Sequence, residues 1–183
     1  MKANFVGLAA GLTAIIALAL PWLTVSSTAV IEDITMDFTV YLYQVQGIIN
    51  GTSATTFPNV WFTLAALALI TLTTLLCFTG SLLSNRKGQL LLLLAGIAAI
   101  LTVVVFGVGL LNSDYANPHL EPAAAMNLFE ANAFGITAEE AMESSYDFVW
   151  GLGYAFWLAL ATAVIAFVAA VVPSLSKKKI ATA

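Results

Sequence analysis

Charged residues are scarce in this sequence: they make up 9% of the chain, while hydrophobic residues make up 61%. A soluble domain of this size needs a polar surface that such a composition cannot supply. The composition therefore indicates an integral membrane protein whose solvent includes the lipid bilayer. It also lacks the clustered basic surface that nucleic-acid-binding proteins use, so we expect no nucleic-acid partner.

Cysteine and histidine are almost absent, which excludes several kinds of site. Cys77 is the single cysteine, so the chain can form neither an internal disulfide nor a CxxC pair nor a thiolate cluster, and we expect a buried small hydrophobe. His119, two residues from Glu121, is the single histidine, and such a pair lacks the three or four ligands of a typical metal site. No serine lies in a GxSxG motif. We predict no catalytic, cofactor or metal site and no enzyme activity.

The chain does contain four long apolar runs, at about residues 5–25, 60–84, 89–111 and 148–172. Each has the length of about 20 residues that crosses a bilayer. We predict an all-α membrane protein, an up-and-down bundle of four transmembrane helices in one domain over residues 1–183, with Pro173 ending the last helix. Two long loops, 26–59 and 112–147, and a short turn, 85–88, connect the helices. We count the first run as a span and not as a signal peptide.

The interiors of these four runs lack Asp, Glu, Lys, Arg and His. Proton relays, ion-coupled transport, voltage sensing and haem ligation all need such residues at membrane depth. Their absence from the sequence argues against a self-sufficient pump, carrier or cytochrome. Passive conduction through an oligomer remains an alternative, although no selectivity-filter pattern is present.

Charges of opposite sign occupy different parts of the chain. All ten acidic residues lie in the two long loops, and the six basic residues lie at the termini or in the short turn: Lys2, Arg86, Lys87, Lys177, Lys178 and Lys179. The positive-inside rule then predicts a multi-pass protein of the plasma membrane with cytoplasmic termini and extracytoplasmic loops. We expect the carboxylates of the second loop to solvate the outer face, with collection of divalent cations as the alternative.

The two long loops predict a small extracytoplasmic cap. Residues 23–45 are rich in β-branched and aromatic types on both sides of Glu32 and Asp33, which predicts a β-hairpin. Residues 46–59 are typical of a turn-rich return, and Asn50 begins an Asn-x-Thr triplet that makes it a glycosylation candidate. In the second loop we predict one short helix over residues 123–133 and another from Thr137, where a capping-box pattern begins.

Aromatic and small residues indicate how the helices are anchored and packed. Tryptophans at the outer ends of the runs predict interfacial anchors: Trp22, Trp61 and Trp150. Pro58 is expected to open the second helix. Small residues recur every four positions in the fourth run, at Gly151, Ala155, Ala159 and Ala163. This stripe predicts a close helix contact, either within the chain or with a separate subunit.

Two further patterns concern contacts inside the membrane. Gly7 and Gly11 have GxxxG spacing, which favours close packing within the chain's own bundle over a dimer contact. Threonines recur along the second run, and we expect their hydroxyls to bond mainly to backbone carbonyls four residues back, or to a neighbouring helix, and not to line a polar conduit.

The whole layout resembles the claudin-type tetraspan arrangement. The resemblance rests on four spans with both ends inside, a strand-rich first outer loop after Trp22, and a short inner turn at residues 85–88. The first loop lacks the Trp-Gly-Leu-Trp stretch and the cysteine pair of claudins, so the resemblance implies the arrangement of spans and neither the disulfide nor paracellular sealing.

From these patterns we expect a non-catalytic structural or scaffolding protein. Its partners would be the lipid bilayer and other membrane or cell-surface subunits, bound through the cap and through small-residue helix faces. An accessory subunit of a membrane enzyme complex, of the respiratory or metal-dependent oxidase type, is the alternative. An oligomeric passive channel is a third hypothesis.

Overall fold

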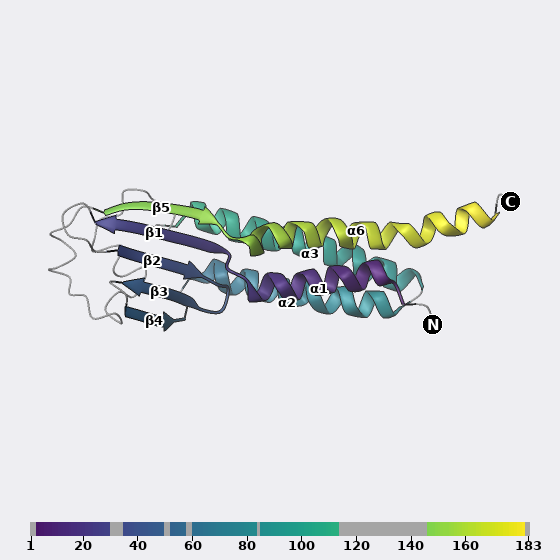
Figure 1. Cartoon of the computed structure of the whole chain (residues 1–183). Helices are drawn as coiled ribbons and strands as arrows, with labels where there is room; N and C mark the ends of the chain where they lie inside the picture. The colour runs from purple at the N-terminus through teal and green to yellow at the C-terminus, as the bar shows by residue number, and fades with distance from the viewer. Residues whose placement is uncertain are drawn as a thin grey trace. The chain divides into compact units, whose positions relative to one another are not determined.

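The computed structural model describes residues 3–29, 35–49, 52–57, 60–83, 85–113 and 146–181. The described residues form four helices and five strands (Figure 1). The chain divides into two compact units. The helical unit comprises Met1–Ala19, Ala65–Val105 and Ala155–Ala183, and the sheet unit comprises Leu20–Leu64 and Phe106–Tyr154. Pro58 and the short helices predicted for the second loop lie outside the described residues.

The helices are α1 (Phe5–Ala19), α2 (Trp61–Leu82), α3 (Arg86–Leu111) and α6 (Tyr154–Ala181). Three segments are long and apolar enough to cross a membrane: α2, α3 and the part of α6 over Tyr154–Val171. The fourth helix, α1, is apolar but has 15 residues. Large aliphatic side chains are exposed along these helices, among them Leu12, Leu75, Leu101 and Val164. An apolar exterior of this kind suits a lipid solvent.

Small residues make up the core of the helical unit. Ala10 of α1, Cys77 of α2, Ala95 of α3 and Ala166 of α6 form one buried cluster, so all four helices contribute to it. Cys77 is a buried free thiol, as predicted. Small side chains in such a core let backbones approach closely, which is how membrane helices gain van der Waals contact.

The two glycines of α1 pack against this chain's own helices. A Cβ placed on Gly7 would collide with Ser81 of α2, and one on Gly11 would come within 3.0 Å of the Phe78 ring. Both glycines are buried. The GxxxG pair therefore makes its close contacts within the bundle, as the sequence favours.

The threonine hydroxyls of α2 bond to their own helix, as predicted. Carbonyls four residues back accept hydrogen bonds from the hydroxyls of Thr71, Thr73, Thr74 and Thr79, at 2.7–2.9 Å. Thr162 of α6 in addition lies between helices, because its hydroxyl is 2.9 Å from that of Thr13 in α1. This contact joins the first and last helices of the bundle.

The strands form one antiparallel sheet in the order β4-β3-β2-β1-β5. Their bounds are β1 (Leu23–Ala29), β2 (Thr35–Val40), β3 (Val45–Ile49), β4 (Thr52–Thr56) and β5 (Tyr146–Leu152). The register aligns Leu23 with Val40 on one side and with Leu152 on the other, and Val40 with Val45. The pairing of β1 with β2 confirms the hairpin predicted over residues 23–45.

The two faces of the sheet differ in burial because the strands alternate apolar and polar residues. Leu23, Val25, Phe38, Val40 and Val45 are buried on one face. The sheet unit adds an aromatic cluster to its apolar core. In that cluster the Trp22 ring centroid lies 5.0 Å from that of Phe106, which lies 5.6 Å from that of Phe62 in an edge-to-face arrangement.

The structure corrects the predicted first span and first loop. The helix expected over residues 5–25 ends at Ala19, because Pro21 interrupts it and the apolar residues Leu23 and Val25 pair in β1. The segment expected as a turn-rich return over residues 46–59 contains strands β3 and β4. The fold is thus mostly helical with a small sheet, and the all-α expectation was too narrow.

The fourth span also differs from the prediction. Residues 146–152 form β5, and the helix begins at Tyr154 instead of Phe148. A short apolar run suits a strand as well as a helix, and here its backbone pairs with all of β1. We expected the helix to end at Pro173, but it continues through this proline to Ala181. A proline within a helix is tolerated in membrane proteins when the freed backbone groups find other partners.

Candidate functional site

The exposed face of the sheet is the first candidate site. Cross-strand pairing aligns Thr24, Thr39, Gln46 and Thr55 in one row and Ser26, Asp37, Ile48 and Ser53 in the next. Seven of these eight side chains are exposed, and Thr39 is half-buried. The face thus presents hydroxyls, one carboxamide, one carboxylate and one half-exposed isoleucine. Such a surface can hydrogen-bond to a polar partner without the cost of burying many charges.

A shallow cavity of about 320 Å³ lies on this face over β2, β3 and β4. Its lining consists of Asp37, Thr39, Gln46, Gly47, Ile48, Ser53 and Thr55. Asp37 is the one ionisable side chain in that lining. General acid–base or nucleophilic chemistry needs a second group that shares or accepts a proton. The described lining therefore suits binding and offers no catalytic pair.

Strand β4 ends the sheet on one side (Figure 1). Its five residues, Thr52–Thr56, carry no charge and no proline. Natural sheets commonly protect their edges with lysines, prolines or bulges, because an edge strand exposes backbone groups that can pair with another chain. No strand lies beyond β4 among the described residues, so this edge is chemically able to accept one.

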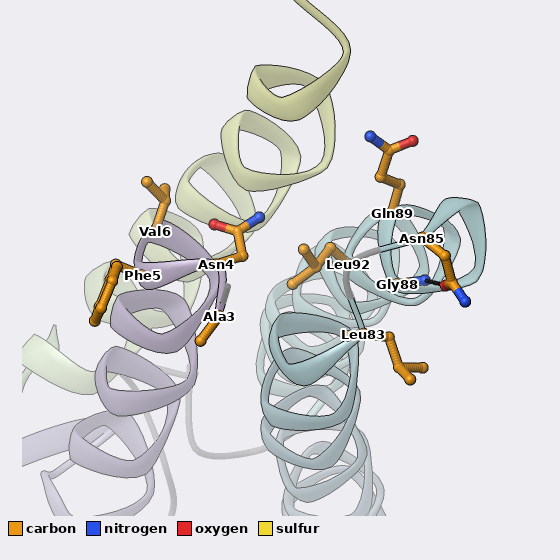
Figure 2. A pocket seen from close by; sticks show the side chains of 10 residues that line it. Ala3, Asn4, Phe5, Val6, Leu83, Asn85, Gly88, Gln89 and Leu92 are labelled. Atoms are coloured by element: carbon orange, nitrogen blue, oxygen red, sulfur yellow. Dashed lines mark hydrogen bonds between the residues drawn. The ribbon is translucent and has the colours of Figure 1, made fainter. Parts of the chain in front are cut away.

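The second candidate is a pocket of about 340 Å³ in the helical unit, between the start of α1, the end of α2 and the start of α3. In Figure 2, Leu92 points from α3 towards the start of α1, where Asn4 lies, while Gln89 points outwards. Its lining is apolar apart from three carboxamides, and consists of Ala3, Asn4, Phe5, Val6, Gly80, Leu83, Asn85, Gly88, Gln89 and Leu92.

Two asparagines at this pocket fix the helix ends. Asn4 Oδ1 accepts a hydrogen bond from the Gly7 backbone N–H, and Asn85 Oδ1 accepts one from that of Gly88, each at 3.2 Å. Both are N-cap contacts that satisfy otherwise unpaired helix donors. Asn4 Nδ2 also donates to the Ala169 carbonyl of α6 at 2.9 Å. One short side chain thus joins the first and last helices.

Close packing of α2 on α3 shapes the wall of this pocket. A Cβ on Gly80 would come within 3.0 Å of the Gly88 carbonyl oxygen, and a Cβ on Gly88 would collide with the Leu83 carbonyl. Only glycine fits at position 88, and a side chain at position 80 would force the two helices slightly apart after their short connection. Arg86 and Lys87, which begin α3 beside this wall, are both exposed.

The predicted tryptophan anchors have different environments. Trp22 is fully buried in the aromatic cluster, so its side chain is not available to lipid headgroups, contrary to our expectation. Trp61, the first residue of α2, is 66% exposed. Its ring centroid lies 6.1 Å from that of Phe62 in an edge-to-face arrangement. Trp150 lies in β5 opposite Val25, and its side chain lies outside the described part of the structure.

The predicted small-residue stripe is divided between two elements. Gly151 belongs to β5, where its carbonyl accepts a hydrogen bond from the Thr24 hydroxyl at 3.3 Å. The three alanines lie in α6, and each is at most 1% exposed: Ala155, Ala159 and Ala163. These alanines are covered by the chain itself, so the stripe does not offer a surface to a separate subunit.

Other predicted positions lie outside the described residues. These are the glycosylation candidate Asn50, His119 with Glu121, and the carboxylates of the second loop apart from Asp147, whose backbone pairs in β5. Among the residues that the structure describes, no three His, Cys, Asp or Glu side chains gather as a metal site would require. The sheet face and the pocket are therefore the two candidate sites among the described residues.

The sequence matches no protein-family model and no curated protein.

The sequence predicted a cap that binds partners, but it did not identify the individual residues that build these two sites. Asn4 precedes an apolar run, as an N-cap does, and that signal could have identified its cap. Its bond to Ala169, however, joins residues 165 positions apart and leaves no local pattern. The row from Thr24 to Thr55 depends on the pairing of four strands, two of which we had expected to be a turn-rich return.

Proposed function

We propose that this protein is a non-catalytic scaffold of the plasma membrane that associates with further copies of itself through its extracytoplasmic sheet. The observation that carries the proposal is the uncharged edge strand β4, which pairs with β3, and the exposed face beside it, where Asp37 of β2 is the one ionisable residue that lines the cavity. Backbone pairing across such an edge gives affinity, and the side chains on the exposed face give specificity.

The proposal includes a claudin-type arrangement with four membrane crossings. Three helices have the length and apolarity to cross. The fourth, α1, spans about 22 Å at 1.5 Å per residue, less than the hydrocarbon thickness of about 30 Å. Its small residues pack against α2, α3 and α6, which supports its crossing with them. Cytoplasmic termini and an extracytoplasmic sheet follow from the positive-inside rule.

A scaffold role fits the chemistry of the described surface. The sheet exposes hydrogen-bonding groups and an unpaired strand edge, while the cavity on it has no proton-sharing pair. The alanine stripe of α6 is buried within the chain, so the small-residue helix face is not the contact that we propose. We therefore narrow the expected contact to the sheet alone.

Native mass spectrometry of the full chain, extracted in mild detergent from its own membrane, tests this proposal. We expect integer multiples of the 19.3 kDa chain for the wild type. Thr55→Lys places a cation on β4, and like charges meeting across a symmetric edge should weaken association by about tenfold or more. The matched control is Thr24→Lys, which adds the same charge to the same exposed face, but on β1, between β2 and β5.

Each outcome of this experiment has a definite consequence. Loss of the multimer in Thr55→Lys but not in Thr24→Lys supports edge pairing, whereas equal multimers in all three proteins overturn it. Co-purification in fixed ratio with heavier chains that carry a coloured cofactor would indicate that the protein is an accessory subunit of a membrane enzyme and not a scaffold. Ion conductance of the purified chain in liposomes would instead favour the passive channel.

A further inference from the structure

We propose that the pocket lined by Asn4, Leu92 and Gln89 binds an anionic phospholipid. One acyl chain enters the apolar pocket, and the phosphate lies on Arg86 and Lys87. This inference uses the membrane placement proposed above, but it is independent of the scaffold role and of the sheet. The pocket belongs to the helical unit, whereas the association proposed above uses the sheet unit.

The first argument is the shape and chemistry of the pocket. Its volume of about 340 Å³ falls in the range of roughly 300–1,000 Å³ that is usual for small-molecule sites. Leu83, Leu92 and Val6 supply apolar contacts for an acyl chain. The pocket lies where α1 begins, α2 ends and α3 begins, so it is level with helix ends and hence with lipid headgroups if the bundle crosses a bilayer.

The second argument is charge complementarity. Arg86 and Lys87 are exposed in the first turn of α3, where the helix dipole already favours an anion and two cations lack local compensation. The helical unit contains all six basic residues of the chain and none of its ten acidic residues. No acidic side chain of this unit can therefore pair with Arg86 or Lys87, and the two exposed cations attract an anionic partner.

The third argument is the supply of hydrogen-bond donors beside these cations. Gln89 and Asn85 line the pocket, and the structure gives their side-chain amide nitrogens no partner among the described residues. A phosphodiester offers oxygen acceptors to a guanidinium, an ammonium and carboxamide N–H groups at once. A zwitterionic headgroup presents the same phosphate together with a cation that Arg86 and Lys87 would repel. The site therefore favours an anionic lipid over a zwitterionic one.

Native mass spectrometry of the full chain from vesicles of equal phosphatidylglycerol and phosphatidylcholine tests the proposal. We expect bound phosphatidylglycerol in the wild type and about thirtyfold weaker retention in R86Q/K87Q, from about 1 kcal/mol per basic residue near an anionic surface. The matched control is K177Q/K178Q, which removes the same two charges from the end of α6 and should retain the lipid.

Two further variants separate the lipid site from a folding defect. Gln89→Glu adds a carboxylate at the edge of the pocket, near Arg86 and Lys87 in sequence. This charge should repel phosphate, although a carboxylate in the first turn of a helix favours folding. Reduced lipid retention with an undiminished unfolding temperature is the expected result. Ala3→Trp fills the pocket without a change of charge and should reduce retention of the acyl chain.

The proposal is overturned if phosphatidylcholine is retained as well as phosphatidylglycerol, if R86Q/K87Q retains the lipid like the wild type, or if K177Q/K178Q loses it equally. Failure of the chain to enter the membrane fraction would refute the membrane placement itself. Membrane-inserted protein without bound phosphatidylglycerol would refute the lipid site alone, and would leave the sheet-mediated association unaffected.

Discussion

The helical unit and the sheet unit differ in the size of their buried side chains and in the polarity of their exposed ones. In the helical unit most buried residues are small, such as Ala10 and Ala166, while many leucine, isoleucine and valine side chains are exposed. In the sheet unit large residues such as Trp22 and Phe38 are buried, and threonine, serine and glutamine cover the exposed face. The units also divide the charges, since all basic residues belong to the first and all acidic residues to the second.

This contrast indicates two solvents and two kinds of stability. In water, burial of large apolar side chains is the main driving force, so the sheet unit keeps its largest residues inside. In lipid that force is absent between helices, and close contact of small residues with a few hydrogen bonds takes its place. Substitutions should therefore have different effects in the two units, and the following predictions test that difference from the largest expected effect to the smallest.

Removal of the buried indole should give the largest effect. Trp22→Ala should destabilise the sheet unit by about 3–5 kcal/mol, because the buried ring contacts Phe106 and its loss leaves a cavity. Denaturant unfolding of the detergent-solubilised protein, with hydrogen exchange of the sheet amides, measures this change. Trp61→Ala is the control, since that ring is largely exposed. Equal losses in the two variants would refute the assignment of Trp22 to the core.

The loss of stability when an exposed isoleucine is replaced by lysine should depend on whether that position faces lipid or water. Ile100 near the middle of α3 and Ile48 of β3 are 40% and 50% exposed. Ile100→Lys should cost about 2.5–3.5 kcal/mol, the cost of a charge at the centre of a membrane helix. Ile48→Lys should change stability by about 0.5 kcal/mol or less, as surface substitutions in water do.

The fraction of each lysine variant that reaches the membrane fraction, followed by unfolding in detergent, checks this comparison. Similar tolerance of Lys at both positions would show that the exterior of α3 faces water, and would remove the contrast between the two units.

Loss of one hydroxyl between helices should give the smallest effect. Thr162→Val removes the contact with Thr13 and should destabilise the helical unit by about 0.6 kcal/mol, the average for such bonds between membrane helices. Thr71→Val is the matched control, because that hydroxyl is exposed and bonds within α2 to the Leu67 carbonyl. Thermal unfolding in detergent measures both. A larger loss in the Thr71 variant would contradict the proposed role of the contact between helices.

The helices were largely predictable because membrane helices need long apolar runs. The runs expected at 60–84 and 89–111 agree with α2 and α3 to within a few residues. The hairpin over residues 23–45 was also predictable, since β-branched and aromatic residues lie on both sides of Glu32 and Asp33 in the sequence. Local composition was sufficient in these segments because each element forms from residues adjacent in the sequence.

The remaining structure depends on partners that are distant in the sequence. The residues of β5 are as apolar and aromatic as those of a membrane helix, and only pairing with β1 makes them a strand. Likewise, Trp22 has the sequence position of an interfacial anchor, but it is fully buried, and its ring lies against that of Phe106, which is distant in the sequence. The pocket at Asn4 arises where three helix ends meet, a juxtaposition that no periodicity encodes.

The position of β5 in the sheet sets an order of events during synthesis. Strands β1 to β4 are consecutive and pair as a meander, whereas β1 meets β5 across 127 residues, as between Thr24 and Gly151. A ribosome has therefore delivered α2 and α3 before the second partner of β1 exists. Until then the nascent chain carries an open edge along β1, and completion of the sheet coincides with arrival of the last helix.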